Sequence, residues 1–342
     1  MGKGSVQVAA MVFCGIDVSA KKLDVALLVE GRDGLVEQEF SNTAAGHKLL
    51  ISWLQRQGAR VRVSLEATGV YSLDLALALD QAPAIEVAVL NPKLANRFAE
   101  TLRRSKNDRT DAAALAEYSR RMPFVAWQRP SRMALELRAI TRHLAQLSQE
   151  RTRLLNRLHA AGGSQTTPDC VRRELKHSLA RCEKAMHRLR GEATIRVQQD
   201  PALRRQAELM TSIPGVGEAS AVQLLSELAG LDPAMTVRQW VALSGLDPVQ
   251  QSSGSSVRKP AHISRQGNRN LRRALYMPAL VASRCDPHLR HFYLTLQQRH
   301  KTKLQALIAV ARKLLHAIYG ICKTATPYDG AKLFPQTQLL TS

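Results

Sequence analysis

The first hundred residues alternate short apolar runs with amphipathic stretches, and this order constrains the fold more than any other feature. Residues 12–17 form an apolar run that predicts a buried strand ending in the acid Asp17. Two further predicted strands, 23–29 and 35–40, are separated by a turn at Gly31 and Gly34. The series continues with a helix over 45–56, a strand over 61–65 that ends at Glu66, a helix, a strand over 85–90 and a helix over 92–102.

This order favours an α/β fold of the RNase H-like (RuvC-like) kind. Three strands in a meander, followed by alternating helices and strands, fit that fold better than a doubly wound Rossmann fold. We expect the domain to span residues 12–127, after a flexible lead-in over 1–11. The lead-in lacks the long apolar stretch and the cleavage site of a secretory signal.

A heptad pattern then predicts an α-helical, coiled-coil middle region over residues 128–203. Its apolar residues fall at two heptad positions, and a second stripe follows the break at 162–164. The three sets are Leu137, Leu144 and Leu158; Ile140, Leu147, Leu154 and Ala161; and Leu175, Leu179, Cys182, Met186 and Leu189. The pattern allows a coiled-coil hairpin or dimer helix, and equally an ordinary helical bundle packed on its own domain.

The remaining chain predicts a mostly α-helical domain over 204–325 and a polar tail over 326–342. Residues 213–217 lie between two helical stretches and have the form of a helix-hairpin-helix turn. Gly215 and Gly217 would allow the tight bend, and the following helix would offer free N–H groups to a phosphate.

Charge narrows the class of partner. The chain has 49 Lys and Arg against 28 Asp and Glu, a net charge of +21. This excess predicts a polyanionic partner. No apolar run approaches the roughly 20 residues that span a bilayer, which argues for nucleic acid over a membrane. The five cysteines are scattered and odd in number, as expected of reduced thiols in the cytoplasm.

Four acids form the sharpest candidate site. Asp17 and Glu66 end two predicted strands, and Asp108 and Asp111 are three residues apart at the start of a helix. The spacing of three puts both aspartates on one helical face. Carboxylates suit Mg²⁺, and two ions about 4 Å apart can clamp the two oxygens of a phosphodiester exchange. Each acid could also be a cap or a surface charge, but jointly they favour a metal site.

A serine run is the second candidate. Ser252 and Ser253 precede Gly254 and are followed by many basic side chains. A serine among guanidinium groups can meet a phosphate whose charge is neutralised. From the residues alone, a flexible phosphate-binding loop without chemistry is favoured. The candidate nucleic-acid contacts are Arg103, Arg104, Lys106, Arg109, Gly215, Gly217, Arg258, Lys259, Arg265, Asn268, Arg269, Arg272 and Arg273.

Several segments, in order along nearly the whole chain, resemble one family. They are Gly15-Ile16-Asp17-Val18, residues 65–71, Asn91-Pro92, residues 106–112, residues 213–217, Gly245-Leu246, Ser253-Gly254 and residues 263–273. Together they are similar to the DEDD transposases, the recombinases of a group of bacterial insertion sequences also called bridge recombinases. The combination is specific, although each segment alone is not.

The resemblance implies a mechanism. The acids Asp17, Glu66, Asp108 and Asp111 would be the DEDD set that binds Mg²⁺ (or Mn²⁺). Ser253 would attack the DNA phosphate and form a covalent phosphoserine link, although Ser252 leaves this assignment ambiguous by one residue. A noncoding bridge RNA would choose target and donor DNA. The coiled coil would join protomers into a dimer, and a tetramer in the synaptic complex, in the bacterial cytoplasm at the nucleoid.

Three rival classes remain at this point. A Holliday-junction endonuclease of RuvC type needs the acids but not the serine. A non-catalytic architectural DNA-binding protein explains the charge, but its four acids would repel DNA without a metal. A sugar-kinase or actin-like ATPase shares the first turn at Gly15 to Ser19, but the chain has no second phosphate loop and no adenosine loop.

Overall fold

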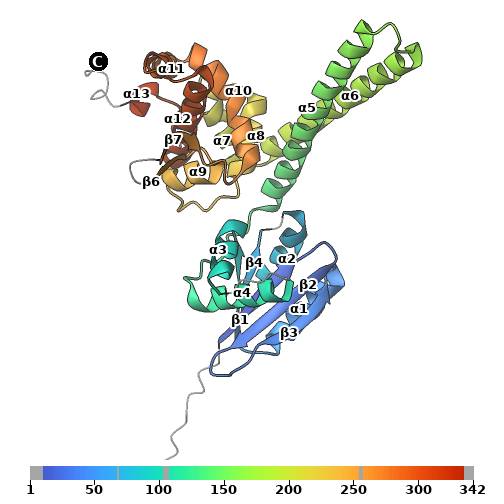
Figure 1. Ribbon diagram of the computed structural model, residues 1–342, viewed down its shortest axis with the longest axis vertical. Helices are drawn as coiled ribbons and strands as arrows, with labels where there is room; N and C mark the ends of the chain where they lie inside the picture. Colours follow the sequence, from blue (N-terminus) through green and yellow to red (C-terminus); the bar gives the residue numbers. More distant parts are fainter. Residues whose placement is uncertain (1–10, 68, 103–107, 254–256, 335–342) are drawn as a thin grey trace, which may run out of the picture. The chain divides into compact units, whose positions relative to one another are not determined.

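The computed structural model describes most of the chain, as two compact units over residues 1–129 and 130–342 (Figure 1). The described residues are 11–67, 69–102, 108–253 and 257–334, and for residues 70, 108–109, 250–253 and 257–261 the description covers the backbone alone. The unit boundary falls where the sequence pattern changes. The finer division of the second unit at residue 203 stays a prediction, because its core includes residues from both sides of that point.

The first unit contains a five-stranded mixed sheet in the order β3-β2-β1-β4-β5. The strands are β1 (Met11–Val18), β2 (Lys22–Val29), β3 (Val36–Ser41), β4 (Arg60–Glu66) and β5 (Ile85–Leu90). Strands β1, β2 and β3 pair antiparallel, whereas β4 lies parallel to both β1 and β5. This topology confirms the RNase H-like fold that the element order predicted.

Helices cover both faces of this sheet. Leu50 and Leu54 of α1 (Ala44–Gln55) and Leu75 and Leu79 of α2 (Val70–Asp80) pack against one face. The other face carries α3 (Pro92–Leu102) and α4 (Asp108–Arg121), and α4 crosses β1 and β2. In Figure 1, α4 lies on the side of the sheet opposite α1. A strand alternates its side chains between faces, so every second residue of β1 faces α4.

The long helices α5 (Arg132–Gly163) and α6 (Asp169–Gln199) pair with each other within the chain. Ser131 caps α5 by accepting a hydrogen bond from the backbone N–H of Ala134. The two predicted apolar stripes meet between the helices, with Leu154, Cys182 and Met186 buried at the centre. The middle region is therefore a helical hairpin, one of the arrangements that the heptad pattern allowed.

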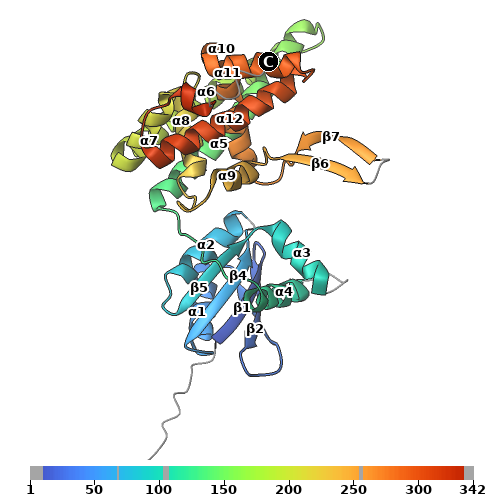
Figure 2. The same ribbon diagram turned by 90° about the vertical axis from the view of Figure 1, so that its left-hand side faces the viewer.

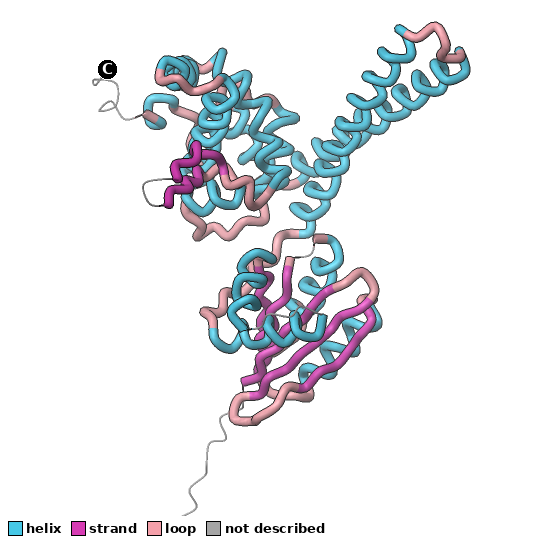
Figure 3. The backbone as a smooth tube through the Cα atoms, viewed as in Figure 1, coloured by secondary structure: helices cyan, strands magenta, loops and turns pink. Residues whose placement is uncertain are grey.

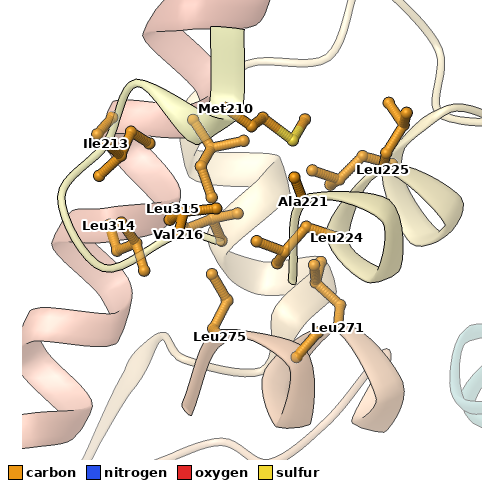
Figure 4. Close-up of a cluster of buried hydrophobic side chains, with 14 of the residues drawn as sticks. Met210, Ile213, Val216, Ala221, Leu224, Leu225, Leu271, Leu275, Leu314 and Leu315 are labelled. Carbon is orange, nitrogen blue, oxygen red and sulfur yellow. The ribbon is translucent and has the colours of Figure 1, made fainter. Parts of the chain in front are cut away.

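The rest of the second unit is a helical core. Its helices are α7 (Pro201–Thr211), α8 (Glu218–Leu228), α9 (Val237–Ser244), α10 (Arg269–Cys285), α11 (Pro287–Gln298), α12 (Lys303–Thr324) and α13 (Gly330–Leu333). Figure 4 shows Met210, Leu224, Leu271 and Leu315 converging at the centre of this core. Among the described helices, only α12 is long and apolar enough to cross a membrane. One face of α12 is buried in the core, as expected of a core helix.

A two-stranded hairpin interrupts the helical part of the second unit. Strands β6 (Pro248–Ser253) and β7 (Val257–Ile263) pair antiparallel, with a register shift between Val249 and Gln251. Figure 2 shows the hairpin extending away from the helices, and Figure 3 shows it as the only strands drawn in this unit. The sequence pattern predicted a serine loop here and not the two strands.

Candidate active site and nucleic-acid interface

Asp17 and Glu66 end neighbouring parallel strands of the first unit. Ile16 pairs with Leu65 in the β1–β4 register, so Asp17 and Glu66 take the next position on their strands. Adjacent strands lie about 4.8 Å apart. Both acids are half-buried, and both belong to the set of alternating positions that faces α4. The sheet therefore brings these two predicted site residues together at one edge.

Gly15 lets α4 lie directly on that edge. A Cβ atom at Gly15 would clash with the backbone of Ala112 and Ala116 in α4. Gly15 and Asp17 are two residues apart on one strand and share its α4 face. Asp111 immediately precedes Ala112 and is half-buried. Close packing at Gly15 thus holds the start of α4, and Asp111 with it, beside the end of β1.

Asp108 is the first residue of α4, one turn before Asp111. Its position on the helix is described and its side chain is not. Within the described side chains, no three His, Cys, Asp or Glu groups gather as a metal site. The assignment of the four acids as one metal site therefore stays a prediction, which their placement on two strand ends and the first turn of α4 supports.

A fifth acid, Asp24, shares this face of the sheet. It pairs with Asp17 across the β1–β2 register and is 6 % exposed. Its carboxylate forms an ion pair of 3.0 Å with the Nζ atom of Lys22, which also lies 3.6 Å from Glu39. Asp24 was not among the acids that the sequence pattern predicted for the site. The available signal was a charged residue inside an otherwise apolar strand, where a buried acid needs a partner.

The two candidate serines lie at the end of β6. Ser252 pairs with Arg258, and Ser253 pairs with Val257. Successive strand positions alternate between the faces of a hairpin, so Ser252 and Ser253 occupy positions on opposite faces. Lys259 pairs with Gln251 and thus shares the face of the Ser253 position. Backbone geometry thus places the two serines on different faces of the hairpin.

A buried ion pair anchors the segment that follows the hairpin. Glu227 of α8 is 2 % exposed, and its two carboxylate oxygens each accept a 2.8 Å hydrogen bond from Arg142 of α5. Asn268 donates a 2.7 Å bond to the same carboxylate and caps α10 by accepting from the N–H groups of Asn270 and Leu271. The structure thus gives the side chain of Asn268 a structural role.

Electrostatics around Glu227 favour its charged form. Burial alone would raise the pKa of Glu227, but hydrogen bonds from Arg142 and Asn268 and the charges of Arg142 and Arg138 hold the pKa below its ordinary value. The segment over residues 264–268, which Asn268 ends, is also held at its start. Ser264 donates a 2.5 Å hydrogen bond to Asp247 and closes the base of the hairpin. Residues 264–268 are therefore held at both ends.

The predicted arginines cluster at the start of α10. Arg272 donates a 2.6 Å hydrogen bond to the carbonyl of Ser244. Burial lowers the pKa of Arg272, and the nearby charges of Arg265 and Arg269 lower it further. Arg265 and Arg269 are exposed, and Arg273 is half-buried. Because these cations repel one another, an anion bound among them would be stabilised.

The turn over residues 213–217 joins α7 to α8, as predicted. Gly215 has a φ of +100°, and a Cβ there would lie 2.6 Å from the amide nitrogen of Ala282 in α10. Gly217 is the N-cap of α8 and is exposed.

The structure describes the remaining predicted basic contacts with nucleic acid only in part. Arg103, Arg104 and Lys106 lie outside the described residues, and Arg109, Arg258 and Lys259 are described by backbone alone.

Two family models match the chain, one over each unit's candidate site. Residues 14–161 match a transposase model of the DEDD class, and this span includes all four predicted acids. Residues 207–294 match a model described as transposase of the IS116/IS110/IS902 family. The second span includes the hairpin with Ser252 and Ser253 and the arginines of α10.

Curated relatives cover most of the chain. The pilin gene-inverting proteins of Moraxella bovis and Moraxella lacunata are each 27 % identical over 327 residues, which is 93 % of this chain and 97 % of theirs. An uncharacterized 43.6 kDa protein of insertion element IS110 from Streptomyces coelicolor is 26 % identical over 163 residues. That match covers 48 % of this chain and 39 % of the relative.

Proposed function

Because the chain belongs to the IS116/IS110/IS902 family of transposases, we propose that it is an RNA-guided recombinase that cuts and rejoins target and donor DNA. The observation that carries the proposal is the close packing of α4 on Gly15. This contact holds Asp111 beside the strand that ends in Asp17. Glu66 ends the next strand, so three of the four acids approach one edge of the sheet.

A DEDD transposase implies a divalent metal, and the donor set fits one. Carboxylate oxygens are hard ligands of the kind that Mg²⁺ and Mn²⁺ prefer. Asp17, Glu66, Asp108 and Asp111 would hold the ion or ions. When bound, the metal would neutralise charge on the phosphate undergoing transfer.

The serine hairpin would supply the nucleophile. In the proposed step, the Oγ atom of Ser253 gives up its proton and forms a bond to the DNA phosphorus. The phosphorus–oxygen bond to one deoxyribose breaks, and that oxygen leaves as a hydroxyl after taking up a proton. The ester formed retains the energy of the phosphodiester, so the reverse attack by another strand's hydroxyl can reseal DNA without ATP.

The basic surface would hold the nucleic acids. The net charge of +21 and the arginine cluster of α10 suit phosphate backbones of DNA and of a guide RNA. The Moraxella relatives are named for inverting a pilin gene, which is also a cutting and rejoining of DNA. We extend the proposal to a homodimer through the α5–α6 hairpin, with a tetramer at synapsis, in the bacterial cytoplasm.

Reprogramming the guide tests this function. The protein is purified from its native host, its bound RNA is sequenced, and the segment complementary to the target is changed. Recombination in Mg²⁺ should move to the newly specified site, and EDTA should stop it. Recombination by RNA-free protein at unchanged sites would refute the guided mechanism. Cleavage without a protein–DNA adduct would instead favour a RuvC-type junction endonuclease, in which water is the nucleophile.

A further inference from the structure

A large groove lies within the second unit, between the base of the α5–α6 hairpin and helices α8, α10 and α12. Its volume is about 1280 Å³. Small-molecule pockets usually measure about 300–1,000 Å³. The groove is therefore large enough to hold several units of a polymer.

The rim of the groove is strongly basic. Arg269, Arg272 and Arg273 line it from the start of α10, and Arg265 from the segment just before that helix. Arg190, Lys301 and Arg312 add cations from three other segments. Within the described part of the chain, none of these seven side chains forms an ion pair with an acid, whereas arginines elsewhere on α5 and α6 do. Among the described residues that line the groove, Glu218 is the one acid. A polyanion is the complementary occupant.

Apolar side chains line the same groove. Tyr276 is 39 % exposed, Met277 58 % and Leu304 59 %. Tyr276 and Met277 lie about one helical turn after Arg272 and Arg273 on α10. A duplex presents its phosphates and sugars on the outside. If a duplex occupied the groove, these apolar side chains would face charged groups. An unpaired strand also presents base faces, which stack on aromatic rings.

We propose that this groove binds an unpaired segment of RNA, with its phosphates on the arginine rim and a base on Tyr276. Ser148, Gln149 and Gln305 also line the groove. Their hydroxyl and amide groups can pair with the 2′-hydroxyl that distinguishes RNA from DNA. The choice of RNA rests on the proposed function, in which an RNA is the resident partner; the charge and the apolar lining alone require only an unpaired strand.

Binding of short labelled oligonucleotides tests the proposal. The full-length protein, freed of RNA, is titrated in EDTA with a ten-nucleotide RNA, the same DNA sequence as a single strand, and a duplex of equal length. The RNA should bind most tightly. Tyr276→Ala should weaken RNA binding by about 5- to 100-fold and leave duplex binding unchanged, whereas Tyr276→Phe should keep the wild-type affinity.

Charge variants and crosslinking supply the controls. Arg190→Ala with Arg312→Ala should weaken RNA binding, and Arg204→Ala with Arg205→Ala removes the same charge from α7, outside the groove, and should have a smaller effect. A photoactivated thiouridine in the RNA should crosslink to residues 272–277. Equal or tighter binding of DNA, an equal effect of Tyr276→Ala on the duplex, or crosslinks only outside the groove would overturn the proposal.

The two proposals can fail separately. Groove variants that bind RNA as the wild type does, in a protein that still forms a DNA adduct, would refute the groove alone. A groove that binds RNA as expected, in a protein that forms no adduct and does not recombine DNA, would refute the recombinase alone.

Discussion

Gly15 of β1 lies against the backbone of Ala112 in α4, with no room for a side chain between them. This contact sets the distance between the sheet and the helix that carries Asp108 and Asp111. Since Asp17 is two residues further along β1 on the same face, we expect a change at Gly15 to disturb the candidate metal site without removing any predicted ligand.

The first prediction follows from this contact. Gly15→Ala should lower the free energy of unfolding of the first unit by about 1–3 kcal/mol, as overpacking does, and should also reduce Mn²⁺ affinity. Chemical denaturation and calorimetric metal titration measure the two effects. Gly191→Ala in the interior of α6 is the matched control, because a Cβ there meets open space. It should stabilise the protein by about 0.5–1 kcal/mol. If Gly15→Ala binds Mn²⁺ as tightly as the wild type does, the position of α4 does not determine metal affinity, and α4 is not part of the metal site.

Neutralising a predicted metal ligand should strongly reduce DNA cleavage and leave the binding of DNA and RNA unchanged. Asp111→Asn keeps the side chain's size but removes its charge, and we expect DNA cleavage to fall by about a thousandfold. Binding of DNA and RNA, measured by anisotropy in EDTA, should persist. Glu86→Gln is the control: this residue is an acid of β5 that forms ion pairs with Arg60 and Arg62. Wild-type cleavage by Asp111→Asn would remove this residue from the site.

The two serines can be told apart by the covalent adduct. If Ser253 is the nucleophile, denaturing gels of the reaction should show protein bound to DNA for the wild type and for Ser252→Ala, and none for Ser253→Ala. Metal binding should be the same in all three, because the acids lie in the other unit. The reverse pattern would move the nucleophile to the opposite face of the hairpin. If Ser252→Ala and Ser253→Ala both still form the adduct, neither serine is the sole nucleophile.

Glu227 should stabilise the second unit in a pH-dependent way. Glu227→Gln should cost about 2 kcal/mol at pH 7, less than the about 3–5 kcal/mol of fully buried pairs, because Arg142 is partly exposed. The folded pKa of Glu227 is below its ordinary value of 4.5. Its stabilisation is therefore complete above that value and is lost as the pH falls through the folded pKa.

Thermal unfolding from pH 7 to pH 3 checks this sign. The melting temperatures of the wild type and Glu227→Gln should differ at pH 7 and converge on acidification. Glu192→Gln breaks an exposed pair with Arg196 and should change stability by less than about 0.5 kcal/mol. If the difference in melting temperature between the wild type and Glu227→Gln grows as the pH falls, the lowered pKa of Glu227 is contradicted. Slower adduct formation by Glu227→Gln, with unchanged metal binding, would show that Glu227 also positions the hairpin.

The sequence predicted the first unit's fold well, because its strands alternate or run apolar between clear turns and its order of elements fits one fold. Asp17 and Glu66 were singled out as candidates because each ends such a strand. Asp24 was missed because one acid inside a strand has no spacing signal, and only the pairing with Asp17 across β1 and β2 reveals its place.

The second unit was harder to predict for a physical reason. Polar residues such as Gln250, Gln251 and Ser252 have little β-propensity, so the strands of the hairpin gave no periodic signal. The heptads of α5 and α6 specified an apolar seam but not its partner, since the same stripe can pack within one chain or between two. The role of Glu227 depends on Arg142, 85 residues earlier in the chain, and no local pattern predicts such a pair.

The alternation along β1 makes the candidate site depend on the register of strand pairing. Val12, Cys14 and Ile16 supply the core against α1 and α2, and the intervening residues supply the contact with α4 and the acid Asp17. A slip of one residue in strand pairing would exchange these two sets. It would turn Asp17 toward the apolar core under α1 and α2, and Ile16 toward the face that carries the candidate metal site. The same pairing error that exposes core residues would therefore also remove a predicted metal ligand from its site.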